Sequence, residues 1–190
     1  KRVVILTDSN GATLGVDAIK NHIPEERRAE FRVEVVVCYT LEEALHRIER
    51  GNVDVEGAVV IIDNITNDVR GTRTRPQTSP EEVAERLRSL VWLMRSKAEA
   101  VVICEVKPMY HINVNPYNLA IHHKFLDHSK VFGCRTMTRL GHLKTDGFHI
   151  GAAYVSVLER TYACALMGIV VPYLTRPDQS WRLEQQQQHL

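Results

Sequence analysis

The chain has no long apolar run and almost no net charge. No stretch of its 190 residues approaches the roughly 18 to 20 consecutive apolar residues that a membrane-spanning helix needs, so we predict no such helix. The net charge is +1 at neutral pH, which gives no bulk electrostatic reason to bind nucleic acid. Hydrophobic residues make up 44% and charged residues 25% of the chain, and these values exclude the disordered and fibrous classes.

Cysteine is scarce, and its spacing excludes two common uses. No pair has the C-x-x-C spacing, so neither a zinc ribbon nor a dense disulfide framework is predicted. The apolar surroundings of the four cysteines predict buried free thiols: Cys38, Cys104, Cys134 and Cys164. Free thiols and the lack of a signal-like segment favour an intracellular location, and a start at Lys1 suggests an excised domain or a processed chain.

Nucleotide and metal motifs are also missing. The segment Gly11–Gly15 lacks the Lys-Ser/Thr pair of a P-loop and the spacing of a dinucleotide-binding turn, so we predict no cofactor. His122, His123 and His128 fall on one predicted helix without a plausible further ligand. This arrangement favours a solvent-facing helix over a metal site.

Apolar segments typical of strands alternate with segments typical of helices along most of the chain. We predict five strands, at residues 3–6, 31–38, 58–62, 100–106 and 130–136. Such alternation indicates one α/β domain, over residues 1–175, in which helices cover both faces of a parallel sheet. The glutamine-rich segment 176–190 is predicted to be a disordered polar tail.

Local start and stop signals place the helices. The first is predicted to end before Pro24, and the second to begin after Thr40, which forms a capping box with Glu43. Ser79 followed by Pro80 predicts the start of the third. The last two are predicted at residues 118–128 and 150–167.

Polar residues that suit serine hydrolysis follow the first and third strands and precede the last helix. Ser9 supplies a hydroxyl nucleophile and Asn67 an amide donor, while His149 and Asp146 supply a base and its orienting acid. Ligands of open parallel sheets bind beyond the carboxyl ends of the strands, and we expect these side chains to lie there. Each has a plainer alternative, namely a helix cap for Ser9, a turn residue for Asn67 and an ordinary loop histidine beside an acid.

The order and spacing of these residues resemble those of the SGNH (GDSL-type) hydrolases, a family of esterases, lipases and deacetylases. The family's Gly-Asp-Ser block reads Thr7-Asp8-Ser9 here, its Gly-x-Asn-Asp block reads residues 65–68, and its Asp-x-x-His block reads residues 146–149. Two glycines of these blocks are replaced. The glycine of the family's second block is also absent, so Cys38 or Tyr39 would have to supply the backbone N–H that this glycine contributes.

The resemblance implies a fold, a mechanism and a role for each residue. The fold would be a flavodoxin-like three-layer α/β/α sandwich with a mostly parallel five-stranded sheet. Ser9 would attack a small carboxylic ester without a metal ion, and His149, oriented by Asp146, would take its proton. Asn67 would donate to the oxyanion, with Asn64 as a rival for that role; Asp8 would cap the turn.

Basic residues lie in two segments close to these blocks: Arg70, Arg73, Arg75, Arg135 and Arg139. If both segments flank one cleft, they would favour an anionic substrate or a nucleic-acid backbone. The alternative is ordinary solvated charge on loops. A second hypothesis for function follows, in which an inactive module of the same fold binds RNA or protein through this basic rim.

Overall fold

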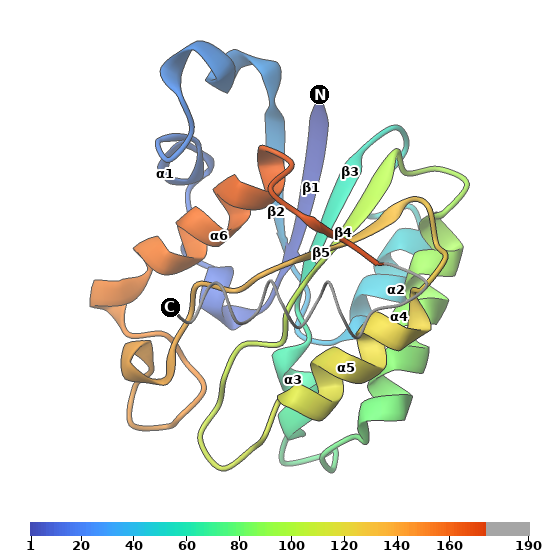
Figure 1. Ribbon diagram of the computed structural model, residues 1–190, viewed down its shortest axis with the longest axis vertical. Helices are drawn as coiled ribbons and strands as arrows, with labels where there is room; N and C mark the ends of the chain where they lie inside the picture. The colour runs from blue at the N-terminus through green and yellow to red at the C-terminus, as the bar shows by residue number, and fades with distance from the viewer. Residues whose placement is uncertain (174–190) are drawn as a thin grey trace.

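The computed structural model describes residues 1–173 and contains a six-stranded sheet, in the order β2-β1-β3-β4-β5-β6. The strands are β1 (Arg2–Thr7), β2 (Arg32–Val37), β3 (Val59–Asp63), β4 (Ala100–Cys104), β5 (Val131–Cys134) and β6 (Val171–Pro172). The first five are parallel, and β6 pairs antiparallel with β5 at one edge (Figure 1). The mostly parallel α/β fold is therefore confirmed. The sixth strand was not predicted, because two residues are too few to show a strand pattern.

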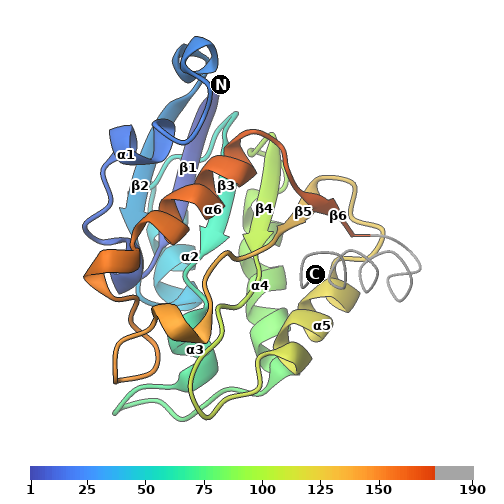
Figure 2. The same cartoon turned by 60° about the vertical axis from the view of Figure 1, so that its left-hand side comes forward.

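Helices cover both faces of this sheet. They are α1 (Val16–Lys20), α2 (Leu41–Glu49), α3 (Thr66–Arg70), α4 (Pro80–Met94), α5 (Asn115–Lys124) and α6 (Ser156–Leu166), with short 3-10 helices η1 (Ser9–Gly11), η2 (Glu25–Glu30), η3 (Leu140–His142) and η4 (Ala152–Tyr154). The two views place α1 and α6 on one face and α2, α4 and α5 on the other (Figures 1 and 2). The short α3 lies near the carboxyl ends of the strands, where β3 ends.

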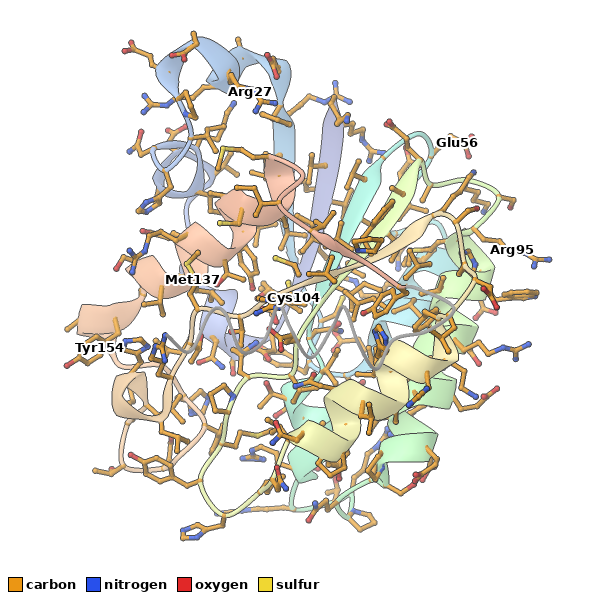
Figure 3. All side chains as sticks on the ribbon, in the orientation of Figure 1. Arg27, Glu56, Arg95, Cys104, Met137 and Tyr154 are labelled. Atoms are coloured by element: carbon orange, nitrogen blue, oxygen red, sulfur yellow. The ribbon has the colours of Figure 1, made fainter. Side chains whose placement is uncertain are left out.

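Alternate residues of the strands face two separate cores. Leu6 and Ile62 pack toward α2 and α4, whereas Ile5 and Ile61 pack toward α1 and α6. All four are completely buried, as expected for central strands of a sheet covered on both sides. Cys104 lies in the interior, while charged residues such as Arg27 and Glu56 lie at the periphery (Figure 3).

The predicted helix caps are present, but several boundaries move. Thr40 Oγ1 accepts a hydrogen bond from the Glu43 N–H, and Ser79 Oγ accepts one from the Glu82 N–H, so both helices begin where expected. The first helix is shorter than predicted because it begins only at Val16, after a turn that starts with η1. The last α-helix begins at Ser156 rather than near residue 150, because the preceding residues form η4.

Two further expectations can be compared with the structure. All four cysteines are free, with only Cys164 partly exposed, which confirms the predicted thiols. His122 is 1% exposed and packs against Tyr173, so the prediction that it faces solvent is wrong. Tyr173, which directly follows β6, lies against this side of α5, so the contact comes from a segment remote in the sequence. None of the helices within residues 1–173 is long and apolar enough to cross a membrane, and the predicted tail at 176–190 lies outside the described residues.

Candidate active site

Ser9 is exposed at the carboxyl end of β1, in a turn that its neighbours define closely. Asp8 caps this turn, because its Oδ1 accepts a 2.9 Å hydrogen bond from the Asn10 N–H. Gly11 packs against the side chain of Thr7 so closely that an added Cβ would overlap it. The turn therefore needs a glycine two residues after Ser9, and it leaves the serine hydroxyl pointing away from the core.

The structure brings Ser9, His149 and Asp146 into one hydrogen-bonded series. Ser9 Oγ lies 3.1 Å from His149 Nε2, although 140 residues separate them in the sequence. His149 Nδ1 lies 2.6 Å from Asp146 Oδ2. An ionised carboxylate can only accept, so Nδ1 carries the hydrogen and Nε2 is left to accept the serine proton. This is the arrangement that activates a serine nucleophile.

A small hairpin carries the histidine. Leu143 and Ile150 form its antiparallel bridge, and the Lys144 N–H donates to the His149 carbonyl. Its turn passes through Gly147, which has a φ of +80°, a value that favours glycine. A Cβ at Gly147 would lie 2.6 Å from Tyr110, so the missing side chain also admits this tyrosine. The turn thus depends on Gly147 for two physical reasons.

Hydrogen bonds keep Asp146 ionised. Desolvation raises the pKa of its carboxyl, but the backbone N–H groups of His149 and Phe148 and the His149 ring lower it further, to about 2. Both N–H groups bond to Oδ1 at 3.0 Å, and Oδ2 is left for the imidazole. Asp146 is therefore negatively charged over the whole range in which a histidine titrates.

Asn10 links the serine turn to the histidine hairpin. Its Oδ1 accepts a 2.8 Å hydrogen bond from the Ile150 N–H, and its Nδ2 donates to the Phe148 carbonyl at 3.3 Å. The two bonded backbone groups lie on either side of His149. The role of this amide was not predicted, because the only sequence signal is the position of Asn10 beside Ser9.

The two candidate amide donors after β3 differ in exposure. Asn67 is partly exposed on the first turn of α3, and its Nδ2 donates a 2.9 Å hydrogen bond to the Tyr39 carbonyl. An amide nitrogen carries two hydrogens, so one remains for an oxyanion. Asn64 is completely buried and donates to the Thr40 carbonyl at 3.1 Å. Exposure therefore favours Asn67 over Asn64.

The backbone donors expected from the second block are already occupied. The Cys38 N–H donates to the Thr7 carbonyl at 2.8 Å, which continues the pairing of β1 and β2. A single N–H cannot serve both partners, and this corrects the expectation that Cys38 supports an oxyanion. The Tyr39 N–H donates to Glu43 at 2.6 Å. The Ser9 N–H begins η1, where the first N–H groups have no acceptor within the helix.

Asp68 holds neighbouring elements together. Its two carboxylate oxygens accept hydrogen bonds from the Leu41 N–H, at 3.0 Å, and from Arg86, at 2.9 Å. Desolvation raises the pKa of this buried carboxyl although both partners oppose the shift. Asp68 thus joins α2, α3 and α4.

A buried ionic network lies beneath the serine turn. Lys107 Nζ is 2.8 Å from Asp63 Oδ1 and 4.0 Å from Asp8 Oδ2. The Tyr162 hydroxyl donates to Asp63 Oδ2 at 2.6 Å and lies 2.8 Å from the Thr7 hydroxyl. None of these five residues is more than 4% exposed. Sequence reasoning missed Lys107, whose only signal is a lysine directly after an apolar strand.

Burial and charge act in opposite directions on this network. Desolvation and the nearby Asp8 raise the pKa of Asp63, while Lys107 lowers it, and the net pKa is raised. Desolvation lowers the pKa of Lys107, but the two carboxylates raise it well above its ordinary value. Lys107 therefore stays charged and holds together two carboxylates that would otherwise repel each other, one of which caps the Ser9 turn.

The predicted basic rim divides into residues with different surroundings. The Arg70 guanidinium stacks 3.6 Å from the centre of the Phe148 ring, and Arg75 pairs with Glu42 at 2.8 Å. Arg75 lines a cavity of about 300 Å³ beside Asn67. Arg73 is exposed, whereas Arg135 and Arg139 border other cavities, on both sides of the segment after β5. The two basic segments thus border separate cavities, and within residues 1–173 no cluster of three metal-ligating side chains is found.

Comparison with known proteins supports the fold. No family model and no curated protein matches the sequence. Among solved structures, a GDSL-like lipase from Bacteroides thetaiotaomicron is similar with a TM-score of 0.62 at 15% identity, covering 89% of each chain. A variant of an acetyl xylan esterase from Geobacillus stearothermophilus is similar with a TM-score of 0.62 at 13% identity, covering 90% of this chain and 96% of the esterase. The resemblance to the SGNH (GDSL-type) hydrolases thus holds at the level of the fold.

Proposed function

We propose that this protein is a serine esterase that hydrolyses a carboxylic ester through an acyl-Ser9 intermediate. One observation carries the proposal, namely the hydrogen-bonded series from Ser9 through His149 to Asp146 at the carboxyl end of the sheet. A helix cap or an ordinary loop histidine would not require these three side chains to meet. The fold shared with several esterases supports the same function.

In the first half of the reaction, Ser9 Oγ attacks the ester carbonyl carbon and gives its proton to His149 Nε2. The carbonyl oxygen gains the negative charge, and the Ser9 N–H and the second amide hydrogen of Asn67 donate to it. The imidazolium, stabilised by Asp146, then passes the proton to the departing alkoxide oxygen as its bond to carbon breaks. The alcohol leaves, and the acyl group remains on Ser9.

Water completes the cycle. His149 takes a proton from a water molecule, whose oxygen attacks the acyl carbon. The tetrahedral intermediate collapses, and the proton returns to Ser9 Oγ as the carboxylic acid is released. Activation of both nucleophiles by His149 means that the mechanism needs no metal ion.

A short acyl group, such as acetyl, suits the surroundings of Asn67. The cavity beside it is small, about 300 Å³, and is lined mainly by polar or charged side chains, among them Thr40, Thr72 and Gln77. A long alkyl chain on the acyl group would leave these polar groups without hydrogen-bond partners. A hydroxyl-rich alcohol portion of the ester would instead supply such partners. The acetyl xylan esterases with this fold act on esters of that kind by their names.

The test is turnover of p-nitrophenyl acetate combined with the intact mass of acid-quenched enzyme. We expect hydrolysis, a mass increase of one acetyl group on Ser9, and labelling by a fluorophosphonate probe. Ser9→Ala should abolish all three, and the exposed Ser129→Ala should change none of them. Full activity in Ser9→Ala would disprove the mechanism. No turnover and no labelling in the wild type would instead favour the binding-module hypothesis.

A further inference from the structure

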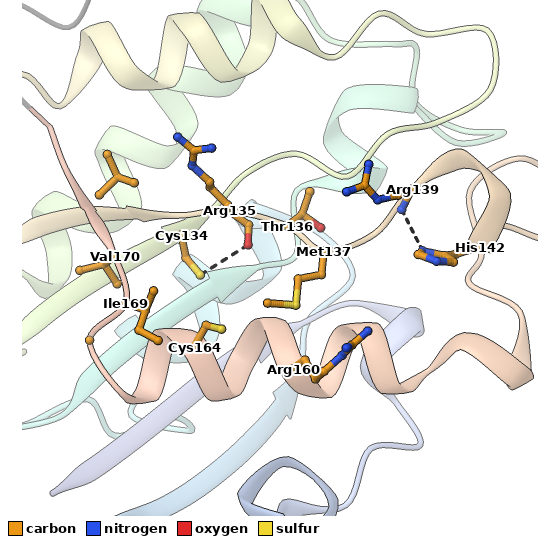
Figure 4. A pocket seen from close by; sticks show the side chains of 12 residues that line it. Cys134, Arg135, Thr136, Met137, Arg139, His142, Arg160, Cys164, Ile169 and Val170 are labelled. Carbon is orange, nitrogen blue, oxygen red and sulfur yellow. Dashed lines mark hydrogen bonds between the residues drawn. The ribbon is translucent and has the colours of Figure 1, made fainter. Parts of the chain in front are cut away.

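A large cavity of this structure is lined by none of the residues proposed for ester hydrolysis, Asn67 included. It has a volume of about 780 Å³, which is within the range of pockets that hold drug-sized ligands. Its walls are α6, the segment that follows β5, and the segment between α6 and β6 (Figure 4). None of the three proposed catalytic residues lines it, so the proposed ester hydrolysis does not explain it.

The cavity has two chemically different ends. Arg139, His142 and Arg160 lie toward one end and Ile169 and Val170 toward the other, while Arg135 lines the cavity between them (Figure 4). Ile169 is 60% exposed and Met137 is 37% exposed, so the cavity presents apolar side chains to solvent. A cationic end joined to an apolar end matches a ligand that has an anionic head and an apolar body.

The cationic groups are available to a ligand. Among residues 1–173, no carboxylate forms an ion pair with Arg139 or Arg160, and no acidic side chain lines the cavity. His142 Nδ1 accepts a 3.0 Å hydrogen bond from the Arg139 N–H, so the neutral ring carries its hydrogen on Nε2 and can donate it. Guanidinium groups bind carboxylates and phosphates in pairs of hydrogen bonds.

We propose that this cavity binds an amphipathic organic anion, with its head at Arg139, His142 and Arg160 and its apolar body along Met137, Ile169 and Val170. The site is separate from the proposed catalytic serine, and the proposal does not depend on esterase activity. Carboxylate and phosphate heads share the required chemistry. Competition by octanoate and by octyl phosphate, with octanol as the neutral comparison, distinguishes them.

The first experiment titrates the protein with 8-anilinonaphthalene-1-sulfonate, a fluorescent probe with a sulfonate head and an apolar body. We expect one saturable site whose affinity falls with salt, and a loss of roughly tenfold or more in the double variant Arg139→Gln/Arg160→Gln. Arg32→Gln removes an exposed arginine at the opposite edge of the sheet and should change nothing. Ser9→Ala should also bind normally, which separates this site from the catalytic serine.

The second experiment locates the bound probe without any substitution. Cys164 lines the cavity and is partly exposed, whereas the other three cysteines are buried. Saturating probe should slow alkylation of Cys164 by iodoacetamide, as measured by peptide mass spectrometry. Unchanged affinity in the double arginine variant, or unchanged alkylation of Cys164, would overturn the proposal. The proposal would also be overturned if the affinity for N-phenyl-1-naphthylamine, which has no anionic head, depended equally on these arginines.

Discussion

The two halves of the candidate active site differ in how their hydrogen bonds are used. On the proton-transfer side, Ser9, His149 and Asp146 bond to one another, and the backbone of the hairpin supports them. On the oxyanion side, the Cys38 and Tyr39 N–H groups bond to other parts of the protein. The first half is thus preorganised for chemistry, while the second relies on Ser9 and on one amide hydrogen of Asn67. Under the proposed mechanism, we therefore expect transition-state stabilisation, rather than nucleophile activation, to limit the rate.

The largest expected effect comes from breaking the proton-transfer side. Asp146→Asn should lower kcat for p-nitrophenyl acetate by about 1000- to 10000-fold, because an asparagine amide can donate to Nδ1 and favour the wrong tautomer of His149. Asp17→Asn, at an exposed position of α1, is the matched control. A loss of less than tenfold would show that Asp146 does not orient the base.

The same side predicts a simple pH profile. Hydrogen bonds lower the pKa of Asp146 to about 2. The stability that its carboxylate contributes is therefore complete above the ordinary pKa and is lost only as the pH falls through about 2. Between pH 4 and pH 8, wild-type kcat/KM should therefore show at most one ionisation, because Asp146 contributes none in this range. A second ionisation in this range, measured with a fluorogenic acetate ester, would contradict the ionised state assigned to Asp146.

The next effect tests the oxyanion side. Asn67→Ala should lower kcat by about 100- to 1000-fold with little change in KM, as is typical for loss of one oxyanion donor. The exposed Asn52→Ala serves as the control. An unchanged kcat would mean that Asn67 only holds the Tyr39 carbonyl, and Ser9 would then be the remaining candidate donor.

A smaller effect is expected from separating the two loops of the proton-transfer side. Asn10→Ala removes hydrogen bonds to Ile150 and Phe148 and should lower kcat by about 10- to 100-fold, since a small misplacement of a catalytic group is costly. Asn10→Asp keeps the acceptor for the Ile150 N–H and should be intermediate. Equal activity in all three proteins would show that the hairpin keeps its position without Asn10.

The smallest expected effect comes from freeing a backbone N–H on the oxyanion side. Glu43→Ala frees the Tyr39 N–H and should raise kcat about threefold if that group then reaches the oxyanion, a gain equal to about one modest hydrogen bond. The same change removes part of the cap of α2, so thermal unfolding should show a loss of about 0.5 to 1 kcal/mol. Glu26→Ala, at an exposed position of η2, is the control. A lower or unchanged kcat would remove Tyr39 from the list of donors.

Much of the fold could be predicted because its signals are local. The buried strands show as apolar runs, and Thr40 and Ser79 mark helix starts by their own hydrogen-bonding chemistry. β6 and α3 were not predicted because neither is long enough to show a hydrophobic period. The burial of His122 was not predicted because it involves a contact with Tyr173, which lies far from His122 in the sequence.

The site divides in the same way. The proximity of Ser9, His149 and Asp146 was predicted because their order and spacing resemble those of the SGNH (GDSL-type) hydrolases, and their catalytic roles stay a proposal. The hydrogen bond of the Cys38 N–H to the Thr7 carbonyl was not predictable, since it depends on the exact register of β1 and β2. The double role of Asn10 and the burial of Lys107 between Asp8 and Asp63 also depend on segments that are far apart in the sequence.

The absorbance of Tyr162 reports on the buried network under Ser9. Desolvation and the nearby Asp63 raise the pKa of Tyr162 well above its ordinary value, so its phenol stays un-ionised in alkaline solution while the fold is intact. Phenolate absorbance from this tyrosine should therefore appear only when the floor of the serine turn opens. Stopped-flow pH jumps on the wild type and on Tyr162→Phe would separate this signal from that of the other tyrosines, among them Tyr173, whose pKa burial also raises, and would time the opening.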